Sequence, residues 1–200
     1  MTTTPIPNDP FANLETMPSI ETERLILRPI VEEDAPALFA IFADPQLMVY
    51  WSMPPFTALE QAEALAREIG ALWRSRTLLQ WGVTRRERGG VIGTVTLSQW
   101  SRSHRRAELG YILARAHHGR GYAREAVAGV LRFAFETMDL HRVGADTDPE
   151  NERSIGLLRS FGFTREGQTR QSYFHLGEWR DAALWGLLRD EWGDGARGSA

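Results

Sequence analysis

Two closely spaced glycines stand in the run His118-Gly119-Arg120-Gly121-Tyr122-Ala123. Glycine lets the backbone approach a ligand closely and adopt positive φ angles. The run precedes a segment with helical periodicity, and a helix start offers unpaired N–H groups and the positive end of the helix dipole. The pattern therefore indicates an anion site suited to a pyrophosphate, to which Arg120 could add a charge-assisted hydrogen bond. A tight turn between a strand and a helix would use the same glycines.

The neighbouring residues exclude two familiar phosphate-binding loops. No Lys followed by Ser or Thr comes after Gly121, as a P-loop requires. Arg124 stands where the dinucleotide-binding fingerprint has its third glycine, and no regular βαβ unit surrounds it. A nucleotide-phosphate enzyme is disfavoured for the same reason, since its phosphate-binding Lys and its metal carboxylates are missing in the required order.

The elements that must position this loop follow from hydrophobic periodicity. Strand patterns occupy 24–30, 78–86, 91–97, 107–113, 142–147, 168–176 and 178–188. Helical patterns occupy 34–44, 57–76, 121–137 and 151–160. The resulting order, β-α-α-β-β-β-α-β-α-β-β, predicts a mixed α/β sheet protein rather than a regular βαβ winding.

Local signals mark several boundaries of these elements. Pro29 predicts the end or the edge of its strand. Thr57 stands three residues before Glu60, which is the spacing of a capping box. The run 88–90, Arg-Gly-Gly, predicts a hairpin turn, and Gly162 predicts the end of the last helix.

Composition restricts the protein class. The chain has 200 residues, and we expect one domain over 19–192, an irregular segment over 1–18 and a flexible tail over 193–200. The absence of cysteine excludes disulfides, thiolate nucleophiles and Cys-ligated zinc. A net charge of −3 argues against a nucleic-acid partner, and no apolar run is long enough for a membrane helix. We expect a cytoplasmic protein.

Two longer runs form one pattern, namely Glu108-Leu109-Gly110-Tyr111-Ile112-Leu113 and the run from Gly119 to Ala126. They resemble the acetyl-CoA-binding motif of a known family, the GNAT N-acetyltransferases. The similarity is greatest to the branch that acetylates the N-termini of ribosomal proteins. Further matches are the runs 23–29, 151–154, 161–163 and 165–167, together with Asp181. The resemblance spans about residues 20–192 and implies an α/β (mixed α+β) fold. Its central sheet would be mostly antiparallel, splayed at the cofactor site and flanked by about four helices.

The resemblance also implies the ligands and their sites. Acetyl-CoA would be the cosubstrate, without a metal, and an amine would be the acceptor. The pantetheine arm would bond to the strand at Tyr111, Ile112 and Leu113, and an N–H there, for example of Ile112, would polarise the thioester carbonyl. The pyrophosphate would lie over His118, Gly119, Arg120, Gly121, Tyr122 and Ala123. Asn151, Ser154 and Arg159 complete the expected cofactor-binding set.

Glu108, Ser154 and Tyr173 are expected to act on the reacting groups, and Glu108 and Tyr173 each have a plainer interpretation. Glu108 would take the proton of the amine, or would be a strand carboxylate paired with Arg105 or Arg106. Ser154 would donate a proton to the departing thiolate, whereas Asn151 would contact the thiol end or simply cap its helix. Tyr173 would reach the acceptor, or pack across its strand pair.

Three positions depart from the family pattern. His118 replaces the usual Gln or Arg before the first loop glycine, and Ser160 replaces a commonly basic residue. Leu158 stands where many relatives carry a tyrosine acid, so the residue that protonates the thiolate is open. His117 and His118 are adjacent loop residues without a further ligand cluster, which argues against a metal site.

Two functions of different classes remain. The first is an N-acetyltransferase that moves an acetyl group directly to a primary amine, either a protein N-terminus or a small molecule. The second is a non-catalytic acyl-CoA-binding sensor or partner subunit, which would use the same glycine loop. Trp51 lies in a loop that borders the acceptor site in this family, and the seven tryptophans would suit a homodimer. Acceptor identity lies in loops that the fold does not fix.

Overall fold

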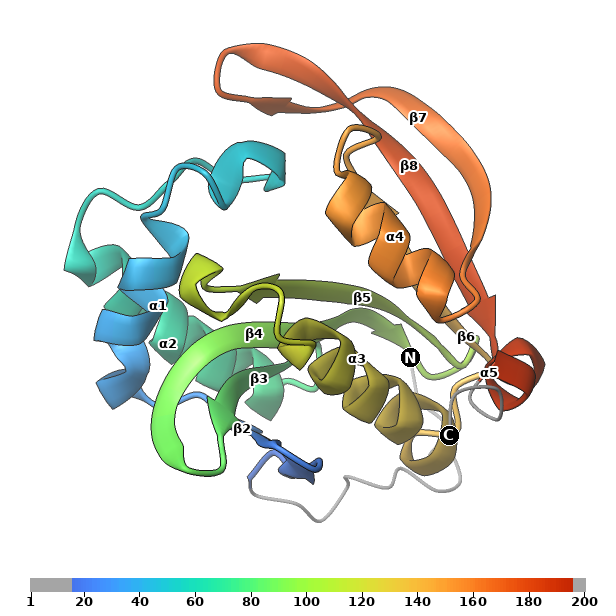
Figure 1. Ribbon diagram of the computed structural model, residues 1–200, viewed down its shortest axis with the longest axis horizontal. Coiled ribbons are helices and arrows are strands. Elements are labelled where there is room, and N and C mark those ends of the chain that lie inside the picture. Colours follow the sequence, from blue (N-terminus) through green and yellow to red (C-terminus); the bar gives the residue numbers. More distant parts are fainter. Residues whose placement is uncertain (1–15, 196–200) are drawn as a thin grey trace, which may run out of the picture.

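A single eight-stranded sheet organises the protein (Figure 1). The computed structural model describes residues 16–195. The strands lie in the order β1-β2-β3-β4-β5-β6-β8-β7. Every neighbouring pair is antiparallel except β5 with β6, which is parallel. Their bounds are Ile20–Glu21, Leu25–Pro29, Leu79–Arg85, Arg88–Ser101, Arg106–Leu113, Arg142–Thr147, Thr164–His175 and Glu178–Leu188 for β1 to β8.

Helices cover both faces of this sheet. Helices α1 (Ala35–Phe42) and α2 (Leu59–Arg74) pack on one face with the short 3-10 helix η2 (Met48–Tyr50). Helices α3 (Tyr122–Arg132) and α4 (Glu152–Ser160) pack on the other face, and α3 continues as a π-helix over Phe133–Thr137. Helix α5 (Arg189–Gly195) follows the last strand. Two apolar cores result, one on each side of the sheet.

The parallel joint between β5 and β6 is short. Only Arg106, Ala107 and Glu108 pair with β6, opposite Arg142, Val143 and Gly144. Beyond Glu108, β5 still pairs with β4 as far as Leu113, and β6 still pairs with β8 as far as Thr147. The two strands therefore diverge toward their carboxyl ends. This confirms the predicted splay in a mostly antiparallel mixed α/β sheet.

Several predicted boundaries are confirmed and two local signals are wrong. Pro29 ends β2, and β6 has the predicted bounds. The hairpin turn lies at residues 86–87, before the glycines, because β4 begins at Arg88 and a bulge absorbs the extra residues. The capping box uses Gln61, whose Oε1 accepts from the Ala58 N–H at 3.1 Å, so Thr57 and Glu60 do not form it.

Strand β1 and helix α5 were not predicted, nor were the 3-10 helices at Met48–Tyr50 and Arg115–His117. Strand β1 has two residues, too few for a periodic pattern. Helix α5 runs to Gly195, past the domain end expected at residue 192. The expected irregular start falls mostly outside the described residues, as does the end of the expected tail. Within 16–195, no helix combines the length and apolarity needed to cross a bilayer.

Candidate functional site

The glycine loop has the conformation that an anion site needs. Gly119 and Gly121 both have positive φ angles, 73° and 77°, and Gly121 is the N-cap of α3. The first helical bond of this turn runs from the Glu125 N–H to the Gly121 carbonyl at 3.0 Å. The amides of Tyr122, Ala123 and Arg124 therefore have no intrahelical partner. No atom lies within 4 Å of the position a Gly119 Cβ would take, so the backbone is open there.

His118 anchors this loop to the end of β5. Its Nε2 lies 2.8 Å from the carbonyl oxygen of Leu113, the last residue of the strand. A carbonyl only accepts, so Nε2 carries the proton and Nδ1 is left as an acceptor. Nδ1 lies 3.4 Å from Nη1 of Arg153 in α4. The histidine thus connects the strand, the loop and the start of α4.

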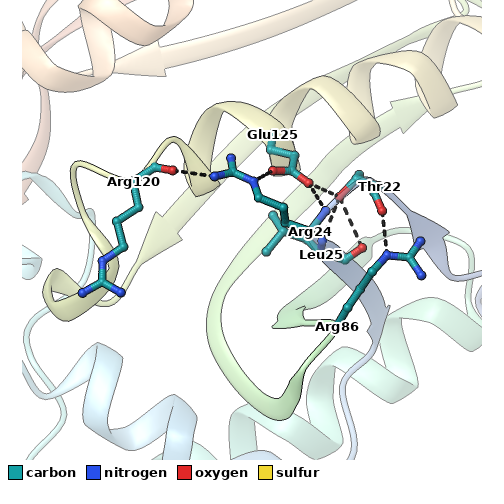
Figure 2. A network of polar contacts seen from close by, with 6 residues as sticks. All are labelled: Thr22, Arg24, Leu25, Arg86, Arg120 and Glu125. Carbon is teal, nitrogen blue, oxygen red and sulfur yellow. Dashed lines mark hydrogen bonds and ion pairs between the residues drawn. The ribbon is translucent and has the colours of Figure 1, made fainter.

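A network centred on Glu125 holds the other side of the loop (Figure 2). Its carboxylate accepts from the Thr22 hydroxyl, the Arg24 amide and Arg24 Nε, each at 2.6 Å. Arg24 Nη1 donates to the Arg120 carbonyl at 3.0 Å. Burial alone would raise the pKa of Glu125, but these hydrogen bonds outweigh it and lower the pKa. The network fixes the loop backbone, while the Arg120 side chain points away from it (Figure 2).

Sequence reasoning gave Arg24 and Glu125 no role. Both lie in runs that carry the family resemblance, but nothing in their local patterns connects residues that are 101 positions apart. One signal could have marked Glu125. It is an acidic residue in the first turn of a predicted helix, where a carboxylate is favourable.

Tyr111 and Ser154 meet where β5 and β6 have separated. The Tyr111 hydroxyl lies 2.7 Å from Ser154 Oγ and 3.3 Å from the Ser154 carbonyl oxygen. Burial raises the pKa of Tyr111 to about 12, so the phenol keeps its proton at neutral pH. Asn151 is the N-cap of α4, and its Oδ1 accepts from the Ser154 amide at 3.1 Å. The capping role of Asn151 is therefore confirmed.

Glu108 lies on the opposite face of β5 from Tyr111. A Cβ on Gly144 of β6 would stand 2.3 Å from Glu108 Oε2, so only glycine leaves room for this carboxylate. Among the described residues, no hydrogen bond or ion pair to the Glu108 carboxylate is found, and Arg105 pairs with Asp139 instead. Burial is the main cause that raises the pKa of Glu108, and the nearby Arg142 opposes it. The expected ion pair with Arg105 or Arg106 is therefore not formed.

Tyr173 approaches the loop that follows β6. Its hydroxyl donates to Asp148 Oδ2 at 3.3 Å, and burial, followed by the Asp148 charge, raises its pKa to about 12. The contact joins the β7–β8 hairpin to the β6–α4 loop, so Tyr173 does more than pack within its strand pair. Asp148 itself is buried.

The remaining predicted residues separate into two groups. Ile112 and Leu113 are buried at the end of β5, and Tyr122 and Ala123 form the first turn of α3. Arg159 lies at the far end of α4 from His118, with its guanidinium 5.6 Å from the ring centre of Trp185. Arg153 takes the place near the loop that was expected of Arg159. Among the described residues, no three His, Asp or Glu side chains gather as a metal site would need.

The arrangement can hold a long ligand with an anionic end and an amide-bearing arm. Open loop amides lie at the carboxyl end of β5, and the unpaired edges of β5 and β6 lie beside them. These edges offer backbone N–H and C=O groups to an arm between the strands. Ser154 and Tyr111 lie along that arm on one face, and Glu108 lies on the other face.

Known proteins are similar to this chain in sequence and fold. The profile described as Acetyltransferase (GNAT) domain matches residues 24–164. The uncharacterized N-acetyltransferase YoaA of Bacillus subtilis is 34% identical over 172 residues, which cover 86% of this chain and 97% of that protein. The spermidine N(1)-acetyltransferase of Escherichia coli K12 is 28% identical, over 83% of this chain and 86% of its own. The structure of Mycobacterium smegmatis RimJ in complex with CoA-disulfide superposes with a TM-score of 0.76 and 27% identity, covering 84% and 83% of the two chains.

Proposed function

Because the chain belongs to the GNAT acetyltransferase family, we propose that it moves the acetyl group of acetyl-CoA directly to a primary amine. The acceptor is a small-molecule amine or a protein N-terminus. Relatives are named as a spermidine acetyltransferase and as a ribosomal-protein-S5-alanine acetyltransferase. The observation that carries this proposal is the convergence of the glycine loop, the splayed strands and Ser154 at one end of the sheet.

Acetyl-CoA would be held by the backbone more than by side chains. The amides of residues 119–124 face its pyrophosphate, and the inner edge of β5 beyond Glu108 faces its pantetheine amides. The open space at Gly119 fits such a cradle, because no side chain fills it. The thioester brings an activated acetyl group, and the residues around it supply position and proton transfer.

The amine must attack as the free base, and Glu108 is placed to accept its proton. The amine nitrogen bonds to the carbonyl carbon, the carbon–sulfur bond breaks, and the electron pair leaves with the thiolate. The proton lost by nitrogen passes to Glu108 directly or through water. Ser154 relays a proton from water to sulfur, so its hydroxyl is regenerated in the same step. A lysine-type amine has a pKa near ~10.4 and an α-amine near ~7.7–8.0, so the lysine type depends more on the base.

The faces of the sheet separate the two substrates. Tyr111 and Ser154 lie on the α3–α4 side with the glycine loop, whereas Glu108 lies on the other side. Asp146 of β6 also projects from that second side, and it is exposed. An acceptor that arrives there as an ammonium ion meets two carboxylates before it is deprotonated.

Two features of the sequence make the test clean. The chain has no cysteine, so a thiol reagent detects only released CoA. All 23 of its Lys and Arg residues are arginine, so no side-chain amine of the protein consumes the acetyl group. We expect CoA release from acetyl-CoA only when a primary amine from a panel of alkylamines, polyamines and N-terminal peptides is present.

Calorimetry with CoA completes this experiment. CoA binding without thiol release for any amine would support the non-catalytic acyl-CoA binder instead. The buried Leu158, at the position of the family's tyrosine acid, is the feature that favours this alternative. Absence of both CoA binding and release would contradict both functions.

A further inference from the structure

Two hydrogen bonds from one hairpin connect parts of the chain that are far apart in sequence. His175, at the end of β7, places Nε2 2.8 Å from the carbonyl oxygen of Met48 in η2. Tyr173, two residues earlier, donates to Asp148 in the β6–α4 loop. The hairpin thus spans from the segment after α1 to the segment after β6, as the ribbon shows at the β7–β8 tip (Figure 1).

The segment 43–56, between α1 and α2, connects β5 with the β7–β8 hairpin. Met48 is buried in the same apolar cluster as Ile112, which lies on the splayed part of β5. Arg115, just after β5, binds Asp44 Oδ2 through Nε and Gln46 Oε1 through Nη1, both at 2.6 Å. This segment is therefore attached at its start to β5 and at Met48 to the hairpin.

These contacts form a closed circuit of chain, which we call the acceptor ring. It runs from β5 through segment 43–56 to His175, then through Tyr173 to Asp148 and back along β6. The ring bounds the splay on the α1–α2 side, because Ile112 packs with that side's core. Glu108 and Asp146 lie on the same side of the sheet.

His175 is buried, although the apolar residues on either side of it are exposed. Its side chain is only 3% exposed, whereas the adjacent Phe174 and Leu176 are each 59% exposed. A hairpin tip that turns a polar ring inward and apolar side chains outward loses hydrophobic burial. The buried ring is satisfied by the Met48 carbonyl, for which Nε2 must carry the proton. The Met48 carbonyl therefore provides the polar partner that a buried imidazole needs.

We propose that His175 is a positioning residue that keeps the acceptor ring closed and thereby selects slender, unbranched amines. The inference rests on the proposed acetyl transfer, because it concerns the path of the acceptor to Glu108. An unbranched alkylamine, or the flexible end of a chain, threads a closed ring. An amine that is branched at the carbon next to nitrogen meets the ring before its nitrogen reaches the thioester. Opening the ring admits the branched amine and leaves the residues expected to bind CoA unchanged.

The test compares two acceptors, n-butylamine and tert-butylamine, in the wild type and in two variants. His175→Ala removes the hydrogen bond, and His175→Gln retains an N–H donor. We expect the wild type to prefer the unbranched amine in kcat/KM, and His175→Ala to reduce this preference roughly tenfold, the scale of steric discrimination by a fitted site. His175→Gln should restore much of it. Phe174→Ala, on the exposed side of the same tip, is the matched control and should leave the preference unchanged.

The CoA-release assay separates the two levels of the proposal. A wild type that releases no CoA with any amine contradicts the proposed function itself. Active variants whose acceptor preference equals that of the wild type overturn the role of His175 alone. If His175→Ala does not fold, Tyr173→Phe opens the ring at Asp148 instead, and an unchanged preference there is equally contradictory.

Discussion

The Tyr111 hydroxyl lies 2.7 Å from Ser154 Oγ, so a strand and a helix are joined by side chains where the sheet no longer joins them. Position 158, where a tyrosine acid was expected from the family pattern, is the buried Leu158. The phenol at this place therefore comes from β5 rather than from α4. It contacts the same serine that was assigned the proton-donating role.

Removing the serine should affect turnover more than binding. We expect Ser154→Ala to lower kcat by ~10²-fold with little change in CoA affinity, because proton donation matters mainly in the transition state. Tyr111→Phe should give a smaller loss, and the double variant should resemble Ser154→Ala, since the two groups act as one unit. Steady-state kinetics and calorimetry measure this, with the exposed Ser103→Ala as control. Additive losses in the double variant would mean that the two hydroxyls act independently.

Glu108→Gln should make the protein more stable and less active. Burial raises the pKa of Glu108, so the folded state holds the proton more tightly than the unfolded state. Its contribution to stability is then greatest below the unfolded pKa, falls as pH rises through the folded pKa, and stays low above it. Glutamine mimics the neutral form. The Tm of Glu108→Gln should exceed that of the wild type at about pH 8 and approach it near about pH 4.

Activity of the same variant tests the assigned base. The rising limb of its pH–rate profile with an alkylamine should move toward the pKa of the free amine, and the rate at neutral pH should fall by ~10²-fold or more. An unchanged limb and rate would show that Glu108 is a structural carboxylate. Asp146→Asn, on the same face, serves to separate a general charge effect from proton transfer.

Glu125→Gln should weaken CoA binding from a distance. The variant loses the ion pair that positions Arg24 against the Arg120 carbonyl, and we expect roughly a tenfold rise in Kd for CoA, the scale of one lost charged hydrogen bond. Hydrogen bonds lower the pKa of Glu125 below its usual range despite burial. The stability it contributes is therefore present above the unfolded pKa and is lost as pH falls through the folded pKa.

Thermal melts across pH check this second expectation. The Tm difference between wild type and Glu125→Gln should be full at neutral pH and shrink in acid. Glu68→Gln, an exposed change on α2, is the matched control. Equal CoA affinity in wild type and Glu125→Gln would show that the loop holds its shape without this network.

Gly121→Ala should weaken CoA binding while Gly156→Ala should not. Alanine at Gly121 would have to adopt a φ of 77°, at a cost of about 1–2 kcal/mol. Its Cβ would also approach Arg24 Nη2 to 3.3 Å. Gly156 lies in α4 with open space around its Cβ position, so alanine there should stabilise the helix by up to about 1 kcal/mol. Unchanged calorimetric affinity in Gly121→Ala would place the pyrophosphate elsewhere.

The sequence carries local features of the site well and long-range ones poorly. The glycine spacing, the β5 pattern and the Asn151 cap depend on a few adjacent residues, and the structure has each of them. The predicted turn at 88–90 is wrong because β4 already begins at Arg88, and the register shifts in the pairing of β3 with β4 absorb the extra residues. Turn signals cannot separate a turn glycine from a bulge glycine.

The composition of the site depended on contacts that no local pattern contains. Alternation along β5 already places Glu108 and Tyr111 on opposite faces, but it does not identify the residue that either side chain contacts. Arg159 and Arg153 lie on one helix and differ only in which end approaches the loop. Which of the two arginines lies near the loop depends on the direction in which α4 leaves β6, and the arrangement of the whole sheet sets this direction.

The splay has a consequence for association between copies of the chain. Free backbone groups on an outer strand attract strands of other molecules and promote aggregation. Here the free edges of β5 and β6 lie in the interior of the sheet, between β4 and β8, and not at its outer margin. The outermost strands are protected differently, since β1 has two residues and β7 is interrupted by two register shifts. The protein thus keeps free backbone groups available inside the sheet while its outer strands offer little to neighbouring molecules.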